Sequence, residues 1–348
     1  MHMADALLAP AVAATMYAAS GVAAGWSVRQ LRREDEPQQL PTMAVASALV
    51  FAGQMINYTI PGTGSSGHLC GGMLLSALLG PQAGFLSMIA VLTIQCLFFA
   101  DGGLMALGAN IWNMAFYGCF VGYYLLWRPI LRSKRNISMP RKIIAASLLG
   151  CVLTLQLGAF SVVLETTLSG ITELPFGAFL ALMQPIHLAI GLVEGAVTAA
   201  VLVFVYRSRP ELLRDVDAAD GTGTRSVRAT LIILATLVVF VGGGLSLLAS
   251  SNPDGLEWSL FGNEEAGYSA NMGLDEDDYG VASNAAETAA AVQEATAILP
   301  DYAFAGSDSP AGTTVSGLVG SVMVAALAAL ICLVGRTLRE KKAAKHSA

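Results

Sequence analysis

The sequence predicts an all-α polytopic membrane protein with about nine transmembrane helices, arranged as a seven-helix unit followed by a two-helix unit. Two properties of the composition carry this prediction: 55% of the residues are hydrophobic and only 13% are charged, whereas charged residues make up about 25% of an ordinary soluble domain. The mean hydropathy is +0.62. The third observation is a pattern, because the charges are confined to short clusters between long apolar runs. A soluble enzyme is thereby excluded.

Nine apolar stretches are interpreted as spans, since a helix needs about 20 apolar residues to cross the hydrocarbon core of a bilayer. They are 6–28, 42–60, 69–80, 83–100, 104–127, 142–164, 178–206, 229–249 and 313–335. The third stretch is too short to cross alone, so we expect a half-length or steeply set helix there. Gly80 and Pro81 then predict a tight turn into the fourth.

The distribution of positive charge supports this count, because cytoplasmic loops carry the Lys and Arg residues of membrane proteins. With nine spans, all 19 Lys and Arg residues fall on one side of the membrane. The four groups are Arg29, Arg32 and Arg33; Arg128, Arg132, Lys134, Arg135, Arg141 and Lys142; Arg207, Arg209, Arg214, Arg225 and Arg228; and Arg336, Arg339, Lys341, Lys342 and Lys345. We therefore expect a cell-membrane protein with its amino terminus outside and its carboxyl terminus in the cytoplasm.

The loop from about 250 to 312 has the opposite character, since it holds no Lys or Arg. Its acidic residues are Asp254, Glu257, Glu264, Glu265, Asp275, Glu276, Asp277, Asp278, Glu287, Glu294, Asp301 and Asp308. One interpretation is a solvated, partly helical external loop. The other is a weak, unselective collector of cations that acts through general field attraction. Residues 208–228 are interpreted as a cytoplasmic linker between a unit at 1–207 and a unit at 229–348.

Several classes of function are disfavoured by missing motifs. The sequence has no phosphate-binding loop, so we expect that the chain cannot use ATP itself. A Ser-His-Asp arrangement, an HExxH helix and a basic aromatic surface for nucleic acid are also absent. The five cysteines show no paired spacing, so no disulfide framework is predicted.

The amino terminus offers a chelating group. No basic segment precedes the first apolar run, so it does not look like a secretory signal peptide, and Met1 is expected to persist because His2 is bulky. The Met1 amine, the His2 amide and the His2 imidazole could close two fused chelate rings on one metal ion. One further nitrogen would complete a square-planar set, a geometry typical of Ni(II) or Cu(II).

His68 is the candidate for that further nitrogen. It ends the glycine-rich segment 61–68, which the topology places on the same outer face as the amino terminus. Glycines permit unusual backbone dihedral angles, so such a loop can enter a protein-lined cavity at membrane depth. The alternative is that a lone loop histidine is incidental.

Other polar residues keep two interpretations each. His187 and Glu194 are seven residues apart on one predicted helical face, and they could form a proton relay or an interhelical hydrogen bond. Cys70 could be a soft ligand or a packing residue. His346 in the basic tail is expected to be inert. Four side-chain amides could form hydrogen bonds to the metal ligands, or could simply form hydrogen bonds between helices. They are Asn57, Gln95, Asn110 and Asn113.

At these residues the sequence resembles a known family, the substrate-binding components of cobalt/nickel energy-coupling-factor transporters of the CbiM/NikM type. The resemblance is carried by the opening Met-His and by the segments 62–81, 98–114 and 183–195. Residues 253–257, PDGLE, resemble the small CbiN/NikN-type component, so the chain looks like a fusion. Ala6 and Cys70 depart from the family pattern without removing a proposed ligand.

The resemblance implies that Ni(II) or Co(II) is a transported substrate, held by Met1, His2 and His68. It implies two partners in the bilayer and cytoplasm: a transmembrane coupling subunit and ATPase subunits. No organic cofactor is expected. It also favours docking of the coupling subunit on the small-residue face at Ala44, Ala48 and Ala52, with packing inside the unit as the alternative. The competing function is an ion-coupled secondary metal transporter that uses His187 and Glu194.

Overall fold

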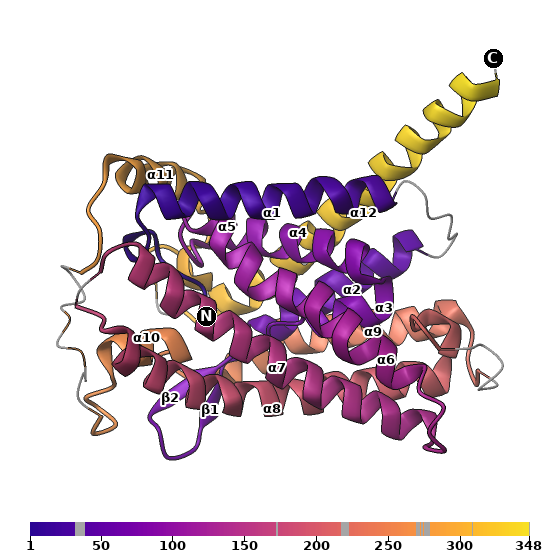
Figure 1. Ribbon diagram of the computed structural model, residues 1–348, viewed down its shortest axis with the longest axis horizontal. Helices are drawn as coiled ribbons and strands as arrows, with labels where there is room; N and C mark the ends of the chain where they lie inside the picture. Colours follow the sequence, from indigo (N-terminus) through magenta and orange to yellow (C-terminus); the bar gives the residue numbers. More distant parts are fainter. Residues whose placement is uncertain are drawn as a thin grey trace.

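The protein is a bundle of helices that run side by side along its long axis in the computed structural model (Figure 1). The described residues are 1–31, 39–171, 173–216, 223–268, 272, 274, 279–307 and 309–347. Some residues named above lie outside the described residues or side chains. They are Arg32, Arg33, Asp275, Glu276, Asp277, Asp278, Asp308, Arg336, Arg339, Lys341, Lys342, Lys345 and His346.

Each of the nine predicted stretches contains helix within the described residues. The first seven correspond to α1 (Pro10–Leu31), α2 (Gln39–Gln54), α3 (Gly72–Leu79), α4 (Pro81–Phe99), the consecutive α5 (Leu107–Asn110), π-helical η2 (Ile111–Trp127) and α6 (Arg128–Leu131), α7 (Met139–Leu168) and α8 (Phe176–Ser208). Proline stands at or next to the first residue of α1, α4, α6 and α7. In α1, α4 and α7 it fits because the first N–H groups of a helix have no intrahelical partner, whereas α6 directly continues η2.

The prediction of a half-length third helix is confirmed. All eight residues of α3 are buried, and at about 1.5 Å per residue the helix is about 12 Å long. Gly80 adopts a φ of 85° between α3 and α4, where an L-residue with a side chain would be strained. Gly72 in α3 lies against Gly118 in η2, so closely that a Cβ at Gly118 would stand 2.8 Å from the Gly72 Cα.

The prediction of a helix over 42–60 is wrong at its carboxyl end. α2 ends at Gln54, and β1 (Tyr58–Ile60) pairs antiparallel with β2 (Ser65–Gly67), with Tyr58 opposite Gly67. The reason is local, because Tyr, Thr and Ile favour strands and the next residues form a turn. Gly62 and Gly64 in that turn have φ values of 76° and 70°, which only glycine adopts without cost.

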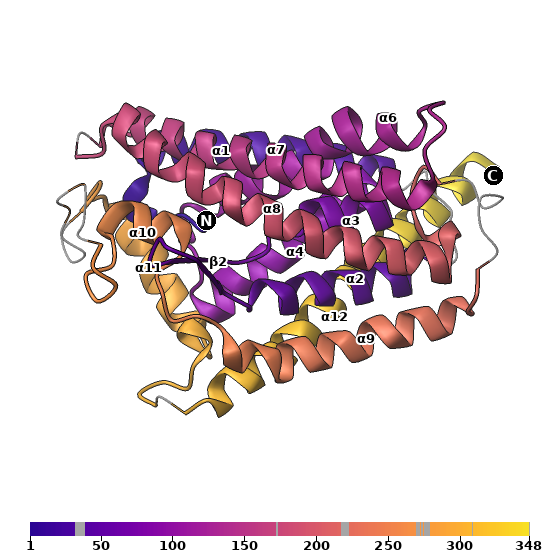
Figure 2. The same cartoon turned by 90° about the horizontal axis from the view of Figure 1, so that it is seen from below.

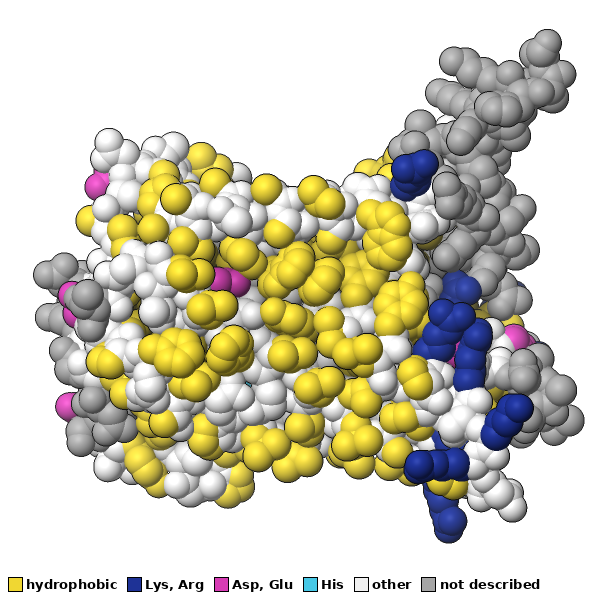
Figure 3. Space-filling view, viewed as in Figure 1, with side chains coloured by type: hydrophobic (Ala, Val, Ile, Leu, Met, Phe, Trp, Pro, Cys, Tyr) yellow, Lys and Arg dark blue, Asp and Glu magenta, His cyan; other side chains and the backbone are white. Residues whose placement is uncertain are grey.

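Five helices in the described residues are long and apolar enough to cross a membrane. They are Pro10–Leu31, Pro81–Phe99, Met139–Leu168, Phe176–Ser208 and Ala311–Gly335, and Val227–Gly243 is a shorter apolar helix. Apolar side chains cover the middle of the face drawn in Figure 3, and the Lys and Arg side chains on that face gather at one end. The chain is therefore a helical membrane protein, and the number of crossings stays a prediction.

The C-terminal segment, residues 227–347, places α9 (Val227–Gly243) and α12 (Ala311–Ser347) along one side of the bundle (Figure 2). Its shorter helices α10 (Gly255–Phe261) and α11 (Asn284–Thr296) lie at one end of the bundle, and the segment also contains η5 (Leu245–Leu248) and η6 (Pro300–Tyr302). Within its described residues, the acidic loop at 250–312 is thus partly helical, and its position outside the cell stays a prediction. α9 and α12 pack together through the backbones of Gly242 and Gly317, and both pack on α2.

Candidate metal centre

The chain begins inside the bundle, where Met1 and Met3 are buried and His2 is partly buried. Met1 is 5% exposed and Met3 is fully covered. The Met3 backbone is clamped from both sides, because its N–H donates to Asn110 Oδ1 at 2.7 Å and its carbonyl accepts from Asn110 Nδ2 at 3.2 Å and from the Gly103 N–H at 2.9 Å. Asn110, in α5, therefore fixes where the amino terminus lies.

The Met1 amine faces two groups. It lies 3.3 Å from His68 Nε2 and donates to Asp254 Oδ2 at 2.5 Å. His68 Nδ1 lies 3.0 Å from the Leu69 carbonyl oxygen. Because a carbonyl oxygen only accepts, Nδ1 carries the proton and the Nε2 lone pair points to the amine. Burial, and then the Met1 ammonium, lower the pKa of His68 to about 3, so its imidazole is neutral at physiological pH.

The strand β2 brings His68 to this position. A Cβ at Gly67 would stand 2.5 Å from Ile190 Cγ1 in α8, so only glycine lets the strand pass this helix. On its other side the Ser66 N–H donates to the Pro253 carbonyl at 2.8 Å, and Ser66 Oγ donates to the Asn252 carbonyl at 2.8 Å. β2 is thereby tied to the residues that precede α10.

Asp254 begins α10 and its two carboxylate oxygens have separate roles. Oδ1 accepts from the N–H groups of Leu256 at 2.8 Å and Glu257 at 2.9 Å, and the Glu257 side chain completes a capping box. Oδ2 is left to face the Met1 amine, and it lies 3.9 Å from His68 Nε2. Burial alone would raise the pKa of Asp254, but the charge of the Met1 ammonium and its hydrogen bond hold this pKa well below its usual range.

His2 is held apart from the pair formed by Met1 and His68. Its Nδ1 forms an ion pair with Asp101 Oδ1 at 2.8 Å, while its Nε2 is buried without a hydrogen-bond partner. Tyr302, in η6, donates to the other oxygen of Asp101 at 2.5 Å. The rings of His2 and His68 are stacked, with centroids 5.2 Å apart and planes at 10°. Nitrogen lone pairs lie in the ring plane, so stacked rings cannot both direct them at one ion.

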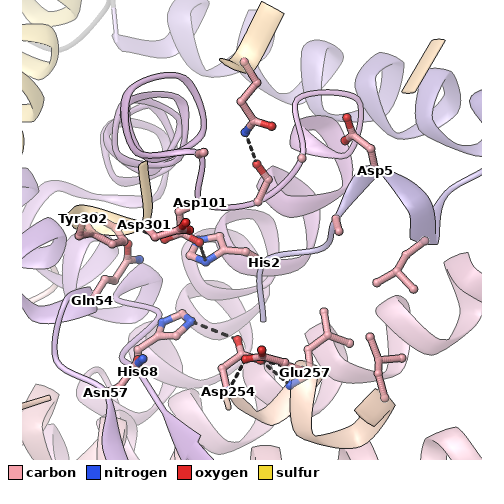
Figure 4. Close-up of a pocket in the computed structure, with 18 of the residues that line it drawn as sticks. His2, Asp5, Gln54, Asn57, His68, Asp101, Asp254, Glu257, Asp301 and Tyr302 are labelled. Carbon is pink, nitrogen blue, oxygen red and sulfur yellow. Dashed lines mark hydrogen bonds and ion pairs between the residues drawn. The ribbon is translucent and has the colours of Figure 1, made fainter. Parts of the chain in front are cut away.

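A cavity of about 760 Å³ opens beside these groups, lined by both histidines, Asp101, Asp254 and Tyr302 among others. Figure 4 shows His2 with Asp101 on one side of it and His68 with Asp254 on the other. Among the described residues, no three His, Cys, Asp or Glu side chains form a group that could hold a metal ion. A metal centre here therefore needs backbone nitrogen, as a terminal chelate provides.

The structure brings together Met1, His68 and Asn110, and it adds Asp101, Asp254 and Tyr302, which the sequence did not single out as site residues. One signal was present for Asp254, because Asp followed three residues later by Glu is a capping-box pattern. The contacts with Met1 and His2 join positions up to 253 residues apart, so no local pattern indicated them.

The remaining predicted amides lie around the centre. Asn57 lines the cavity, and Gln95, buried in α4, lies beside Tyr302. Asn113 donates to Glu165 Oε2 at 2.8 Å and to Met3 Sδ at 3.6 Å. The Cys70 thiol donates to the Met114 carbonyl at 3.2 Å, in keeping with a packing residue.

His187 and Glu194 are both buried in α8 and have different partners. His187 Nδ1 lies 2.8 Å from the Met183 carbonyl of its own helix. Glu194 accepts from the N–H groups of Cys70 at 2.7 Å and Gly71 at 2.9 Å. Glu194 therefore anchors the start of α3, and no hydrogen bond described for either residue joins the two side chains.

The small-residue face of α2 is covered in this chain. Ala48 is 6% exposed and Ala52 is fully buried, and a Cβ at Gly242 in α9 would stand 3.4 Å from the Ala52 Cβ. Internal packing, which the sequence left open, is what the structure has at these two positions.

Comparisons with known proteins agree with this architecture. Residues 2–212 match the CbiM family, described as the cobalt uptake substrate-specific transmembrane region, and residues 228–337 match the PDGLE domain. A putative fused nickel transport protein NikMN of Archaeoglobus fulgidus is 36% identical over 340 residues, which are 97% of this chain and 100% of that protein. The fused nickel transport protein NikMN of Rhodobacter capsulatus is 33% identical, over 94% of this chain and 95% of its own.

A solved structure supports the fold of the first part of the chain. The crystal structure of a transition metal transporter is 30% identical, with a TM-score of 0.53, over 60% of this chain and 94% of that one.

Proposed function

Because the chain belongs to the CbiM family of cobalt-uptake transmembrane proteins and carries a PDGLE domain, we propose that it is the metal-capturing subunit of an ATP-driven nickel or cobalt importer of the energy-coupling-factor type. Transport of nickel or cobalt is the activity in the names of its relatives. The energy would come from a transmembrane coupling subunit and cytoplasmic ATPase subunits, since the sequence has no phosphate-binding loop of its own.

The proposed ligands are the Met1 amine, the His2 amide and imidazole, and His68. The observation that carries this set is the 3.3 Å separation of the Met1 amine and His68 Nε2. In a planar terminal chelate the amine, amide and imidazole take three consecutive corners, so the fourth ligand stands next to the amine. With bonds of about 2 Å, neighbouring corners are about 2.8–3 Å apart. The pair needs little adjustment to share an ion.

His2 has further to move. The chelate ring that its imidazole closes with its own backbone nitrogen can use only Nδ1, because Nε2 is too far from that nitrogen. Nδ1 is occupied by Asp101, and the ring is stacked on His68. Loading therefore requires that the His2 ring leave both contacts. The Met1 amine and His68 would thus be in place before the ion binds, and the His2 ring would move onto the ion afterwards.

The proposed topology follows the charge distribution. The cavity would open outside the cell, the basic end would face the cytoplasm, and the units would be 1–207, the linker 208–228 and 229–348. The second unit would assist loading, since its residues Asp254 and Tyr302 contact the terminus and Asp101. Cutting after residue 208 is then expected to weaken uptake, and co-expression of the remainder should restore it.

Docking of the coupling subunit at Ala44, Ala48 and Ala52 is a separate prediction. α9 and α12 pack on α2, so the partner could use this face only after the C-terminal segment shifts. Ala48→Leu should then spare metal binding by the purified chain and lose co-purification with the coupling subunit. Loss of folding and of metal binding together would assign Ala48 to internal packing alone.

The central test extends the chain by one residue before Met1, which blocks the amine geometry. Isothermal titration with Ni(II) and Co(II) should show loss of the high-affinity phase, although a different and weaker chelate can form. A matched extension after Ala348 is the control and should bind like the unextended protein. Equal binding by both extended proteins would refute the terminal chelate.

The competing secondary-transport function has no supporting contact, since His187 and Glu194 have separate partners. It predicts metal uptake by this chain alone in proteoliposomes with a proton gradient, whereas the importer requires ATP and partner subunits.

A further inference from the structure

Asp101 holds the His2 ring through one of its two carboxylate oxygens (Figure 4). Oδ1 lies 2.8 Å from His2 Nδ1, and Oδ2 accepts from the Tyr302 hydroxyl at 2.5 Å. Because a carboxylate accepts hydrogen bonds, Nδ1 carries a proton in this contact. The other ring nitrogen, Nε2, is buried without a hydrogen-bond partner in the described structure. Asp101 therefore occupies the nitrogen that the proposed chelate needs.

The C-terminal segment fixes the position of Asp101 from two sides. Gln293, in α11, donates to the carbonyl of the neighbouring Gly102 at 2.7 Å. The Tyr302 ring stacks on the buried Phe99, with centroids 4.9 Å apart and planes at 17°. Tyr302 has a φ of 59°, which a bulky residue adopts only under strain. Such strain persists where the surroundings hold a residue in place, and it is frequent at functional sites.

Metal binding would change the partners of both His2 and Asp101. Once Nδ1 binds the ion, Oδ1 of Asp101 loses its donor, and a buried acceptor without a donor is unfavourable. A neutral imidazole bound through Nδ1 carries its proton on Nε2, so Nε2 becomes a buried donor that needs an acceptor. The neutral ring gives the Nδ1 proton to water in the cavity and takes one at Nε2, and its charge is unchanged.

Each of these two atoms is the partner that the other lacks. Histidines that bind metals generally donate their second N–H to a carboxylate, a carbonyl or water, and Asp101 is the carboxylate that already contacts this ring. We infer that Asp101 accepts a hydrogen bond from His2 in both states of the site, from Nδ1 without the ion and from Nε2 with it, and that Tyr302 positions Asp101 for this exchange. This inference rests on the proposed function of the chain.

The two states differ in how much they depend on Asp101. Without the ion, a His2 ring released from Asp101 can turn into the cavity of about 760 Å³ and meet water. With the ion, the chelate fixes the ring, so Nε2 depends on an acceptor close by. Loss of the Asp101 carboxylate should therefore weaken metal binding, and loss of the Tyr302 hydroxyl should do so to a smaller extent.

The experiment uses the full chain with its native terminus, labelled with ¹⁵N at histidine and loaded with one equivalent of Ni(II). Four nitrogens in a square plane keep Ni(II) diamagnetic, so nuclear magnetic resonance can observe the ligand rings. We expect a His2 Nε2–H signal that exchanges slowly with water. The Nδ1–H of His68, directed at the Leu69 carbonyl, is the internal reference. The signals of the other two histidines are identified by their absence from His187→Ala and His346→Ala.

Three variants separate the acceptor from the residue that positions it. Asp101→Ala should lose the slow His2 signal, keep the His68 signal and bind Ni(II) about tenfold more weakly. Asp101→Asn retains a carbonyl acceptor and should recover the signal in part. Tyr302→Phe keeps the stack on Phe99, and should exchange faster and bind about fivefold more weakly. Tyr268→Phe is the matched control, since it removes a hydroxyl that donates to the Gly62 carbonyl, and should behave like the wild type.

An unchanged His2 signal and affinity in Asp101→Ala would overturn the inference. Tighter binding by that variant would overturn it as well, because Asp101 would then only compete with the ion for Nδ1. An unchanged exchange rate in Tyr302→Phe would remove Tyr302 from the proposal. In each case the proposed function would stand, since the wild-type chain still binds Ni(II). Failure of the wild-type chain to bind Ni(II) or Co(II) at all would overturn both.

Discussion

His68, on the connection between β2 and α3, and His187, in the middle of α8, use their rings in the same way but in different surroundings. In each, Nδ1 is directed at a backbone carbonyl, that of Leu69 at 3.0 Å or of Met183 at 2.8 Å, which leaves Nε2 as a free lone pair. His68 lines the cavity of about 760 Å³. His187 lines a void of about 10 Å³, shared with Met1, His68 and Asp254.

The difference teaches that access to a cavity, rather than ring chemistry, distinguishes His68, the proposed ligand, from His187, for which we propose a structural role. A void of that size holds about one water molecule, and His187 Nε2 is buried in it without a hydrogen-bond partner in the described structure. His68 Nε2 instead faces the Met1 amine. Variants at and between the two histidines therefore test the comparison, and their effects should decrease from His68 to His187.

The largest effect is expected for His68→Ala. Loss of a direct ligand should weaken metal binding by roughly 100-fold or more, which is at least about 2.7 kcal/mol. Isothermal titration of the purified chain measures this, with His2→Ala expected to behave alike. Undiminished affinity in His68→Ala would remove the fourth ligand from the site.

A pH effect on stability should distinguish His68 from an exposed histidine. Its pKa is lowered to about 3 in the folded protein, against about 6.5 in an unfolded chain. Below pH 6.5 the unfolded chain binds a proton that the folded chain does not, so stability falls as pH falls. Between pH 7 and pH 5 the expected loss is about 2 kcal/mol from this residue.

Thermal unfolding of metal-free protein in detergent at the two pH values measures that loss, with His68→Gln as the comparison. The substituted chain should lose less stability on acidification. Equal losses in both proteins would contradict the buried, neutral state of His68.

An intermediate effect is expected for Gly255→Ala, because Gly255 lines the small void that His68 and His187 share. A Cβ there would stand 2.6 Å from Ile186 Cγ2 and 3.3 Å from His187 Cε1, so α10 must shift and carry Asp254 away from Met1. We expect metal affinity to fall about tenfold with the fold retained. Gly177→Ala tests for general damage, since a Cβ at Gly177 in α8 would meet nothing within 4 Å and its φ is not positive. Normal metal affinity in Gly255→Ala would show that the position of α10 does not affect metal binding.

The smallest effect is expected for His187→Ala. Equilibrium affinity should change less than about threefold, because removal of a non-ligating ring leaves the donor atoms in place. Uptake rate and melting temperature can fall, since a buried ring is lost. A loss of affinity as large as that of His68→Ala would show that His187 also binds the ion and that its small void opens.

The helices could be predicted from the sequence because hydropathy and proline positions are local properties. The carboxyl-terminal boundary of α2 could not be predicted, because the strand β1 has only three residues. A strand that short shows no periodic pattern that would distinguish it from the apolar run before it. Met1, His2 and His68 were proposed as ligands from their chemistry, on the basis of one dipeptide and one glycine-rich loop, and their role stays a prediction. Asp101 and Tyr302 were missed because their role depends on which distant residues meet at the cavity. The sequence left open whether Ala48 packs internally, because the segment that covers it is distant in the chain.

The ion pair between Met1 and Asp254 joins the first residue of the chain to one that is synthesised much later. Ribosomes add about 5–20 residues per second, so the carboxylate is synthesised more than about ten seconds after its partner amine. Until then the Met1 amine lacks the carboxylate that faces it in the finished protein. A polypeptide that stops before α10 would have to bury this amine without its carboxylate, and the amine would then lose its proton or move toward water. The contact between Met1 and Asp254 would therefore be one of the last contacts of the cavity to form.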